Sequence, residues 1–202
     1  ICERNLGDLG HLLDRDTVAA VIVEPVQGEG GVRVLDEALL QGLRTLTRER
    51  EIALIFDEVQ CGLGRTGTLF TYEQSGVVPD MVTLAKPLAG GLPMGAVLLS
   101  EEIARTIQPG DHATTFGGGP FVAAVALHVF DRLSDVALLR SVTENGKWME
   151  SQLTSLVAST PRVRAVRGVG YMWGIDVVEP AAGAVARALE AGLLILSAGD
   201  YT

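Results

Sequence analysis

Residues 52–60 have the sequence IALIFDEVQ, an apolar run that passes directly into Asp57 and Glu58. A short, continuous apolar run of this kind is typical of a β-strand that is buried on both faces. Residues 18–24 (VAAVIVE) and residues 81–86 (MVTLAK) have the same form. The three predicted strands end at the charged residues Glu24, Asp57 and Lys86.

A helix is predicted between the first two strands. Residues 35–50 carry leucines at helical spacing, and Asp36 is placed to cap the helix. Strand, helix, strand is the repeat of an open α/β sheet with helices on its faces. After Lys86 a turn-rich stretch leads to another apolar run, Gly95–Leu99, and this connection is too short for a crossover helix. The strand at 95–99 is therefore predicted to run antiparallel to the one before it.

Beyond Ser134 the sequence predicts a smaller α+β unit. Its predicted helices are 136–158 and 181–191, its predicted strands are 163–166, 172–178 and 193–196, and a helix at 121–133 precedes the unit. We therefore expect two parts, residues 1–134 and residues 135–202. Trp148 and Trp173 are assigned to the core, because an indole ring is most simply accounted for by burial.

Composition excludes several classes of partner. The net charge is −9 and no Lys/Arg-rich block is present, so neither nucleic acid nor a membrane surface is an expected partner. Apolar runs are broken well before membrane-spanning length, and no secretory pattern opens the chain. Cys2 and Cys61 are too few for a disulfide framework and too far apart for a metal-binding pair, which indicates a reducing, cytoplasmic setting. His112 and His128 lack other ligands at metal-binding spacing, so no metal is expected.

The ends of the chain indicate a fragment. The first residue is Ile1 rather than methionine, and the chain stops at Thr202 without a clear end to an element. We expect a longer protein with an additional N-terminal part and a short additional C-terminal segment.

The charged strand ends indicate a binding site, because ligands of open α/β sheets bind beyond the carboxyl ends of the strands. A single Asp or Lys at a strand end is more simply a structural ion pair. Together, however, Lys86 and Asp57 match what pyridoxal phosphate requires, namely an amine that forms a Schiff base and a carboxylate opposite the pyridine nitrogen. Val59 could press an apolar face on the ring, and Gln60 could hydrogen-bond the ring oxygen.

Five segments in this order resemble class III (ornithine/acetylornithine-type) aminotransferases, and the resemblance spans essentially the whole chain. They are EPVQGEGG (24–31), FDEVQCGLGRTG (56–67), LAKPLAGGLPMGA (84–96), HATTFGG (112–118) and RGVGYMWG (167–174). The resemblance implies a pyridoxal-phosphate-dependent transferase of fold type I. The chain would hold the second half of the large α/β domain, of the aspartate-aminotransferase type, and part of the small α+β C-terminal domain.

The resemblance also implies roles for individual residues. Lys86 occupies the position of the cofactor-binding lysine, and Asp57 that of the partner of the pyridine nitrogen. The remaining implied cofactor contacts are Glu58, Val59, Gln60 and, on the phosphate of the neighbouring subunit, Thr115. Thr114 would lie near the substrate, and Glu29 would help to separate the amino donor from 2-oxoglutarate. The family forms obligate homodimers with sites at the subunit interface.

Some family features differ or fall outside the chain. Gly119 stands where many members have asparagine. The other phosphate-binding loop, an aromatic residue over the ring and an arginine for the substrate carboxylate would precede Ile1. A second carboxylate-binding arginine would follow Thr202. The chain alone is therefore expected to be inactive.

The resemblance is closest to acetylornithine/succinylornithine members, which implies transfer of the terminal amino group of N-acetylornithine to 2-oxoglutarate in arginine biosynthesis. An ornithine, 4-aminobutyrate or diaminopelargonate-type transaminase, or an aminomutase, would share every motif. A non-catalytic relative would not need to retain both Lys86 and Asp57. A nicotinamide-dependent dehydrogenase is a further alternative, because residues 62–67 (GLGRTG) spell G-x-G-x-x-G. That fingerprint requires glycines that open a helix directly after a strand, which is not predicted here.

Overall fold

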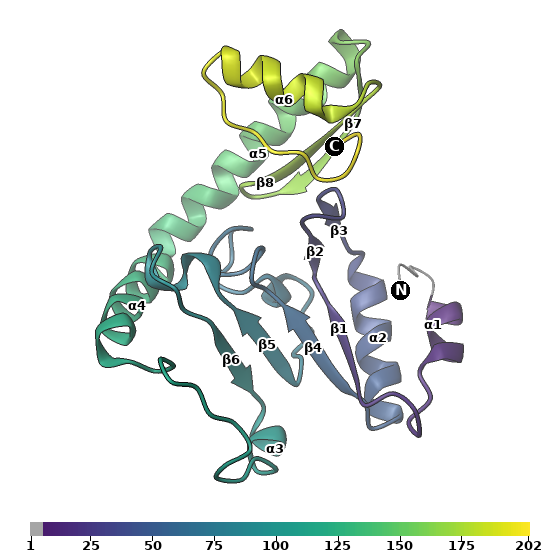
Figure 1. Cartoon of the computed structure of the whole chain (residues 1–202). Helices are drawn as coiled ribbons and strands as arrows, with labels where there is room; N and C mark the ends of the chain where they lie inside the picture. The colour runs from purple at the N-terminus through teal and green to yellow at the C-terminus, as the bar shows by residue number, and fades with distance from the viewer. Residues whose placement is uncertain (1–5) are drawn as a thin grey trace.

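The computed structural model describes residues 6–202 and has a lower and an upper part, joined by one long helix (Figure 1). The lower part contains a four-stranded sheet of β1 (Ala20–Val23), β4 (Ala53–Asp57), β5 (Met81–Leu84) and β6 (Ala96–Leu99). The upper part contains the pair β7 (Val163–Val169) and β8 (Met172–Val177). Helix α5 (Val136–Ser159) leads from the lower part to the upper part.

The strand directions confirm the predicted α/β sheet. The order is β1-β4-β5-β6, in which β1, β4 and β5 are parallel and β6 is antiparallel to β5. A second, two-stranded antiparallel pair, β2 (Val26–Gln27) and β3 (Arg33–Val34), brackets the Gly-rich loop that follows β1. The parallel strands therefore bring the residues after β4 and β5 to one edge of the sheet.

Helices are present at all four positions predicted above, 35–50, 121–133, 136–158 and 181–191. The helices in residues 6–202 are α1 (Leu6–Leu12), α2 (Glu37–Glu49), α3 (Glu101–Ala104), α4 (Pro120–Leu133), α5, α6 (Ala181–Glu190) and the 3-10 turns η1 (Thr71–Gln74) and η2 (Lys86–Ala89). Asp36 caps α2 as expected, because its side chain accepts a hydrogen bond of 2.8 Å from the amide of Ala38. The short helix α3 was not predicted from the sequence.

One face of the sheet carries the core. Leu54 and Phe56 of β4 are fully buried against Leu40 and Leu43 of α2. On β5, Val82 and Leu84 form a second cluster with Leu63 of the segment between β4 and η1, Leu88 of η2 and Ala126 of α4. Because Phe56 is paired with Val82 across the two strands, both clusters lie on the same face.

The opposite face corrects the expectation that these strands are buried on both sides. Ile22 of β1 is 61% exposed and Val97 of β6 is 54% exposed. Within residues 6–202, β1 has a single neighbouring strand, and the core clusters that contain α2 and α4 form on the other face. An apolar run indicates that a strand is suited to packing, but it does not identify the segment that covers each face of the strand.

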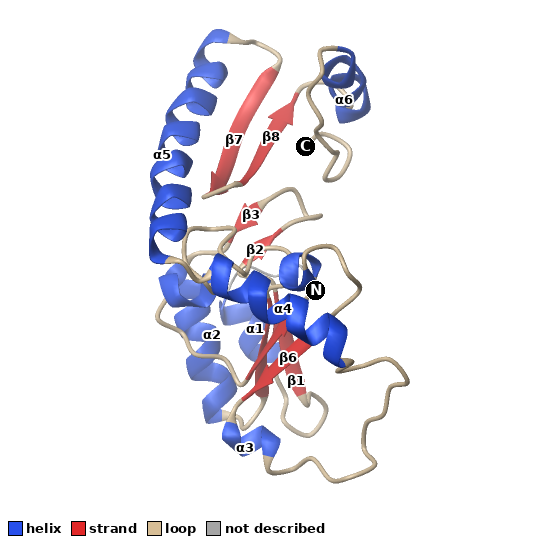
Figure 2. Ribbon diagram, turned by 90° about the vertical axis from the view of Figure 1, so that its left-hand side faces the viewer, coloured by secondary structure: helices blue, strands red, loops and turns tan. Residues whose placement is uncertain are grey.

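The upper part has the predicted α+β composition. Helix α5 lies alongside β7, and α6 follows β8 (Figure 2). Helix α4 instead packs on η2 of the lower part, so the chain passes from one set of contacts to the other near Ser134. The division into residues 1–134 and 135–202 stays a prediction that agrees with these contacts. A small cluster of Val26, Val32, Cys61 and Met172 joins the two parts.

Three sequence predictions in the upper part need correction. Residues 193–196 form no strand, and Leu194 and Leu196 are 83% and 90% exposed. An apolar run becomes a strand only where another strand accepts its backbone hydrogen bonds. Trp148 is 64% exposed on α5 rather than in the core. Trp173 is half-buried, and its indole N–H donates to the carbonyl of Gly170 at 2.7 Å.

Residues 6–202 contain neither a candidate membrane-spanning helix nor a candidate metal-binding cluster. No helix in this range is both long enough and apolar enough to cross a membrane. The same range contains no group of three or more His, Cys, Asp or Glu side chains that could hold a metal ion. Cys61 is buried and unpaired, whereas Cys2 lies outside the described residues.

Candidate active site

Asp57 lies at the carboxyl end of β4 with one carboxylate oxygen fixed. Its Oδ1 accepts hydrogen bonds from the amide of Val59 at 3.0 Å and from the hydroxyl of Thr83 at 2.9 Å. Thr83 is the register partner of Asp57 on β5. No hydrogen bond to Oδ2 is found within the described part of the chain, so that oxygen can accept a hydrogen bond from a ligand.

Lys86 follows β5 directly and begins η2. Its φ of +40° lies in the left-handed region, which is unusual for a residue with a side chain, and Pro87 comes next. Lys86 lines a pocket of 270 Å³ together with Gln60, Arg65 and Tyr171. The turn therefore fixes the direction in which the lysine leaves the sheet edge, and the structure brings Lys86 and Gln60 together.

The Gly-rich loop after β2 packs directly on Gln60. A Cβ added to Gly28 would lie only 1.8 Å from Oε1 of Gln60, so the side chain occupies the space that any other residue would need. The amide of Gly28 donates to the carboxylate of Glu24 at 3.0 Å. Glu29 is exposed on this loop.

Asp57 borders a different space from Lys86. It lines a cleft of 740 Å³ along the β1 edge, together with Gln27, Gly30 and Arg33 of the β2–β3 segment. The Gly-rich loop borders both spaces, because Gly28 contacts Gln60 of the Lys86 pocket while Gly30 lines the Asp57 cleft.

Glu58 points into the core rather than toward either cavity. It is 1% exposed, and its two carboxylate oxygens accept hydrogen bonds from the amides of Thr71 at 2.7 Å and Tyr72 at 2.8 Å. Burial raises the pKa of Glu58 to about 7, although these two backbone hydrogen bonds oppose the rise. Its side chain therefore holds η1 in place beneath the site, and its implied role at the cofactor stays a prediction.

Glu58 should make stability depend on pH. Its pKa in the folded protein is above the usual value of 4.5, so protonation favours the folded state and stability falls as pH rises from about 4.5 to about 7. We expect the Glu58→Gln variant to lose this slope, which amounts to up to about 3 kcal/mol. Urea midpoints at pH 5 and pH 8 measure it. Glu49→Gln, which changes an exposed carboxylate of α2, is the control, and an undiminished slope in Glu58→Gln would contradict the assignment.

Thr114 and Thr115 lie apart from Lys86 in the single chain. Thr114 lines a separate pocket of 400 Å³ with His112 and Phe116, and Thr115 is exposed. Their segment connects α3 to α4. The structure therefore does not bring these two threonines to the Lys86 pocket, and their implied roles stay predictions.

Several residues around the site were not identified from the sequence. Thr83 could have been found, since it lies across from Asp57 once adjacent parallel strands are assumed. Tyr171 and Arg65 share the Lys86 pocket because the amide of Tyr171 donates to the carbonyl of Arg65 at 2.9 Å. That contact joins segments far apart in the chain, and no local pattern indicates it.

The G-x-G-x-x-G segment has a different structure from a dinucleotide-binding turn. Residues 61–66 form turns, with φ of +87° at Gly64 and +102° at Gly67. A four-residue 3-10 turn, η1, follows instead of an α-helix. The helix N-terminus that would bind a pyrophosphate is therefore missing from this segment, and the dehydrogenase alternative is not supported.

Solved structures share this fold over the whole chain. An N-acetylornithine aminotransferase from Stenotrophomonas maltophilia superposes with a TM-score of 0.89 at 36% identity, covering 100% of this chain and 54% of that one. An ornithine δ-aminotransferase from Plasmodium falciparum gives a TM-score of 0.93 at 32% identity, covering 100% and 54%. The mixed sheet, with a lysine and a carboxylate at the ends of neighbouring parallel strands, is that of pyridoxal-phosphate-dependent transferases of fold type I.

Sequence comparison identifies the family. The model of aminotransferase class-III matches residues 1–202, and the chain belongs to this family. It is 47% identical over 195 residues to a mitochondrial acetylornithine aminotransferase of Alnus glutinosa, covering 96% of this chain and 43% of that protein. It is 45% identical over 185 residues to an acetylornithine aminotransferase of Methanocaldococcus jannaschii, covering 92% and 46%. The chain thus spans less than half the length of these relatives.

Proposed function

We propose that this chain contributes the cofactor-binding part of an aminotransferase that moves the terminal amino group of N-acetylornithine to 2-oxoglutarate, in arginine biosynthesis. The proposal rests on one observation above all: Lys86 and Asp57 stand at the ends of adjacent parallel strands, and Thr83 fixes the carboxylate. The names of the relatives support the choice of amino donor.

The residues at this sheet edge fit pyridoxal phosphate. Asp57 keeps Oδ2 available while Oδ1 is held by two donors, as a carboxylate facing a protonated ring nitrogen requires. Lys86 and Gln60 share one pocket, so an amine and an amide can reach the same ligand. When bound, the cofactor supplies an electron-accepting ring and a carbonyl carbon that reacts with amines.

Each residue has a defined task in the proposed reaction. Nζ of Lys86 would hold the cofactor, and the same amine, when free, would remove the proton from the carbon that bears the substrate amine. The charge of Asp57 would keep the ring nitrogen protonated. Val59 would pack on the ring, and Gln60 would hydrogen-bond its oxygen. Glu58 would act from below by holding η1.

The remaining assignments extend beyond one chain. We propose a homodimer in which Thr115 binds the cofactor phosphate of the neighbouring subunit and Thr114 lies near the substrate. Glu29 would help to distinguish the amino donor from 2-oxoglutarate. We also propose a cytoplasmic location and the two-domain division at residue 134. The likeness covers less than half of the relatives, so residues outside this chain would complete the site.

Borohydride trapping of the full-length protein tests the cofactor assignment. We expect a visible absorbance band that reduction abolishes, with the label recovered on the peptide that contains Lys86. Lys147, on α5, is the only other lysine of the chain and serves as the internal control. Label on Lys147, or on a lysine outside this chain, would refute the assignment of Lys86.

Amino-donor profiling separates the proposed substrate from its alternatives. N-acetylornithine should give the highest kcat/KM among N-acetylornithine, ornithine, 4-aminobutyrate and diaminopelargonate-type donors. A higher value for any of the other donors would assign the protein to a different member of the same family. Hydride-linked absorbance changes with a nicotinamide cofactor would instead support the dehydrogenase alternative.

A further inference from the structure

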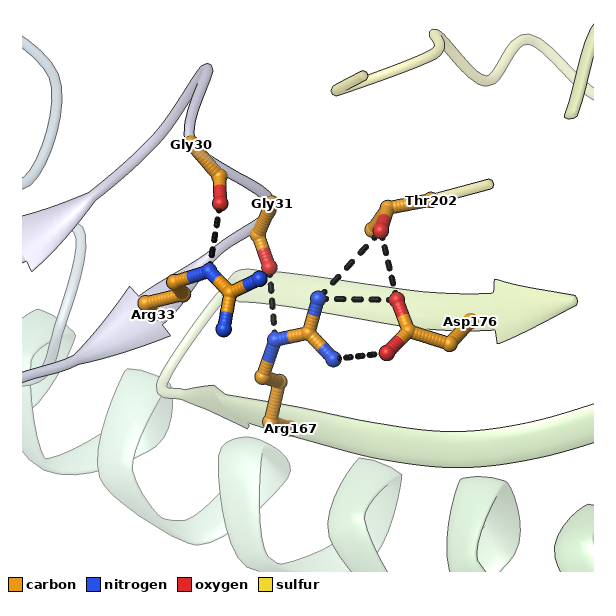
Figure 3. Close-up of polar contacts among 6 residues, drawn as sticks. All are labelled: Gly30, Gly31, Arg33, Arg167, Asp176 and Thr202. Carbon is orange, nitrogen blue, oxygen red and sulfur yellow. Dashed lines mark hydrogen bonds and ion pairs between the residues drawn. The ribbon is translucent and has the colours of Figure 1, made fainter. Parts of the chain in front are cut away.

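Arg167 connects the small C-terminal sheet to the Gly-rich loop (Figure 3). Its Nε donates to the carbonyl of Gly31 at 2.6 Å, while its two terminal nitrogens form a fork with Asp176 of β8 at 2.5 and 2.8 Å. The hydroxyl of Thr202 donates to the same carboxylate at 2.5 Å. Bidentate arginine–carboxylate pairs fix direction as well as charge, so the guanidinium is oriented before it meets the loop.

The ion pair between Arg167 and Asp176 is charged and partly buried. The hydrogen bonds from Arg167 hold the pKa of the Asp176 carboxyl below its usual range, so the carboxylate remains charged near neutral pH. Both side chains are mostly shielded from solvent, with 23% and 28% of their surface exposed. A charge-assisted bond in such a setting is stronger than one between exposed neutral groups.

The loop needs external support because of its glycines. Gly28, Gly30 and Gly31 lack the side chains that would restrict their backbone, and Gly31 has a φ of +94°. Gly28 is held on Gln60, and the amides of Gly31 and Val32 both donate to the carbonyl of Gly28 at 3.0 Å. Arg167 holds the other end of the loop.

The small sheet also approaches the loop closely at a second position. A Cβ added to Gly174 of β8 would lie 3.0 Å from Cβ of Val32 and 3.2 Å from the carbonyl oxygen of Gly31. Val32 itself is buried with Met172 of β8. The loop therefore rests on the C-terminal sheet along its return limb, and Arg167 supplies the directional contact.

We infer that Arg167 is a positioning residue for amino-donor recognition, acting through the Gly28–Gly31 loop that borders both the Asp57 cleft and the Lys86 pocket. This inference rests on the proposed function. Arg33 also donates to this loop, from its Nε to the carbonyl of Gly30 at 2.8 Å, but it belongs to the same segment and is exposed. Among residues 6–202, only Arg167 ties the loop to another part of the molecule through a fixed ion pair.

The test is the Arg167→Lys variant of the full-length protein. Lysine keeps the positive charge for Asp176 but cannot donate to Gly31 and form the fork at the same time. We expect the KM for the amino donor to rise about tenfold with kcat unchanged, as for the loss of a charge-assisted hydrogen bond. Hydrogen exchange at the amides of Gly31 and Val32 should accelerate in the same variant.

Arg164→Lys is the matched control on the same strand. Arg164 contacts the carbonyl of Val178 at 3.3 Å and the ring of Tyr201, away from the loop, so KM and exchange should match the wild type. Asp176→Asn provides a second test, since it keeps the side-chain shape and releases the fork. Asp176→Asn should also raise the KM for the amino donor. If Arg167→Lys fails to fold, Asp176→Asn tests the positioning role of Arg167 in its place.

The outcomes separate this inference from the proposed function. Unchanged loop exchange in Arg167→Lys, or faster exchange with an unchanged KM, would overturn the positioning role. Absence of label on Lys86 in the wild-type protein would overturn the proposed function instead. In that case the exchange rates alone would decide whether Arg167 holds the loop.

Discussion

In the proposed aminotransferase, replacing Lys86 with alanine is expected to lower kcat for amino transfer by about 10⁴-fold or more, because this one amine would both hold the cofactor and move the proton. Few other amines in the chain could replace that of Lys86. Lys86 and Lys147 are the only lysines in the chain, and Lys147 lies on α5 outside the Lys86 pocket. Steady-state kinetics with N-acetylornithine and 2-oxoglutarate, together with the absorbance of the bound cofactor, measure the loss.

Comparing Lys86→Ala with Lys86→Arg separates the effect of the amine from the effect of its charge. Lys86→Arg keeps a positive charge that cannot be deprotonated near neutral pH, so it should be as inactive as Lys86→Ala. Lys147→Ala should retain wild-type kcat. Activity of Lys86→Ala above one hundredth of the wild-type value (about 10⁻²) would show that another group removes the proton, because general acid–base catalysis alone contributes about 10²–10⁴-fold.

Replacing Asp57 with asparagine should lower kcat by about 10²–10³-fold, comparable to the loss of one preorganised electrostatic contact at a reacting centre. The amide oxygen of asparagine can still accept the hydrogen bonds from Val59 and Thr83, so the local structure should persist. The negative charge that is proposed to keep the ring nitrogen protonated would be lost. Single-turnover rates measured at saturating cofactor separate this effect from weaker cofactor binding.

Thr83→Val is the control for Asp57. It removes one hydrogen bond to Oδ1 but leaves the charge and the bond from Val59 in place. We expect less than about a tenfold loss, as for a single neutral donor. If Thr83→Val proved as damaging as Asp57→Asn, the orientation of the carboxylate rather than its charge would carry the effect.

The predicted fold succeeded where local pattern and global packing agree. The run that ends at Asp57 forms β4, the leucine periodicity at 35–50 forms α2, and the short connection after Lys86 gives an antiparallel β6. The prediction of a strand at 193–196 was wrong, because apolar character alone supplies no strand partner. The exposure of Trp148 has the same origin, since periodicity says which face a residue is on but not whether that face is covered.

The sequence could indicate the candidate site only in part. Lys86 and Asp57 follow from two apolar runs and the rule that parallel strands end at one edge. Glu58 stands next to Asp57 in the chain, yet its side chain faces the opposite way and binds the amides of η1. Adjacent residues of a strand point to opposite faces, and only the packing decides which face receives a ligand.

The sequence by itself determined the α/β class, the charged residues at the ends of the parallel strands, and the family. These features depend on short-range periodicity and on the order of motifs along the chain. The tertiary structure alone decided that Arg167 holds the carbonyl of Gly31, 136 residues earlier in the chain. It also decided that Thr83 fixes Asp57 and that Gln60 fills the space beside Gly28. Such contacts depend on where separate segments meet in three dimensions, and no local pattern of residues encodes that meeting.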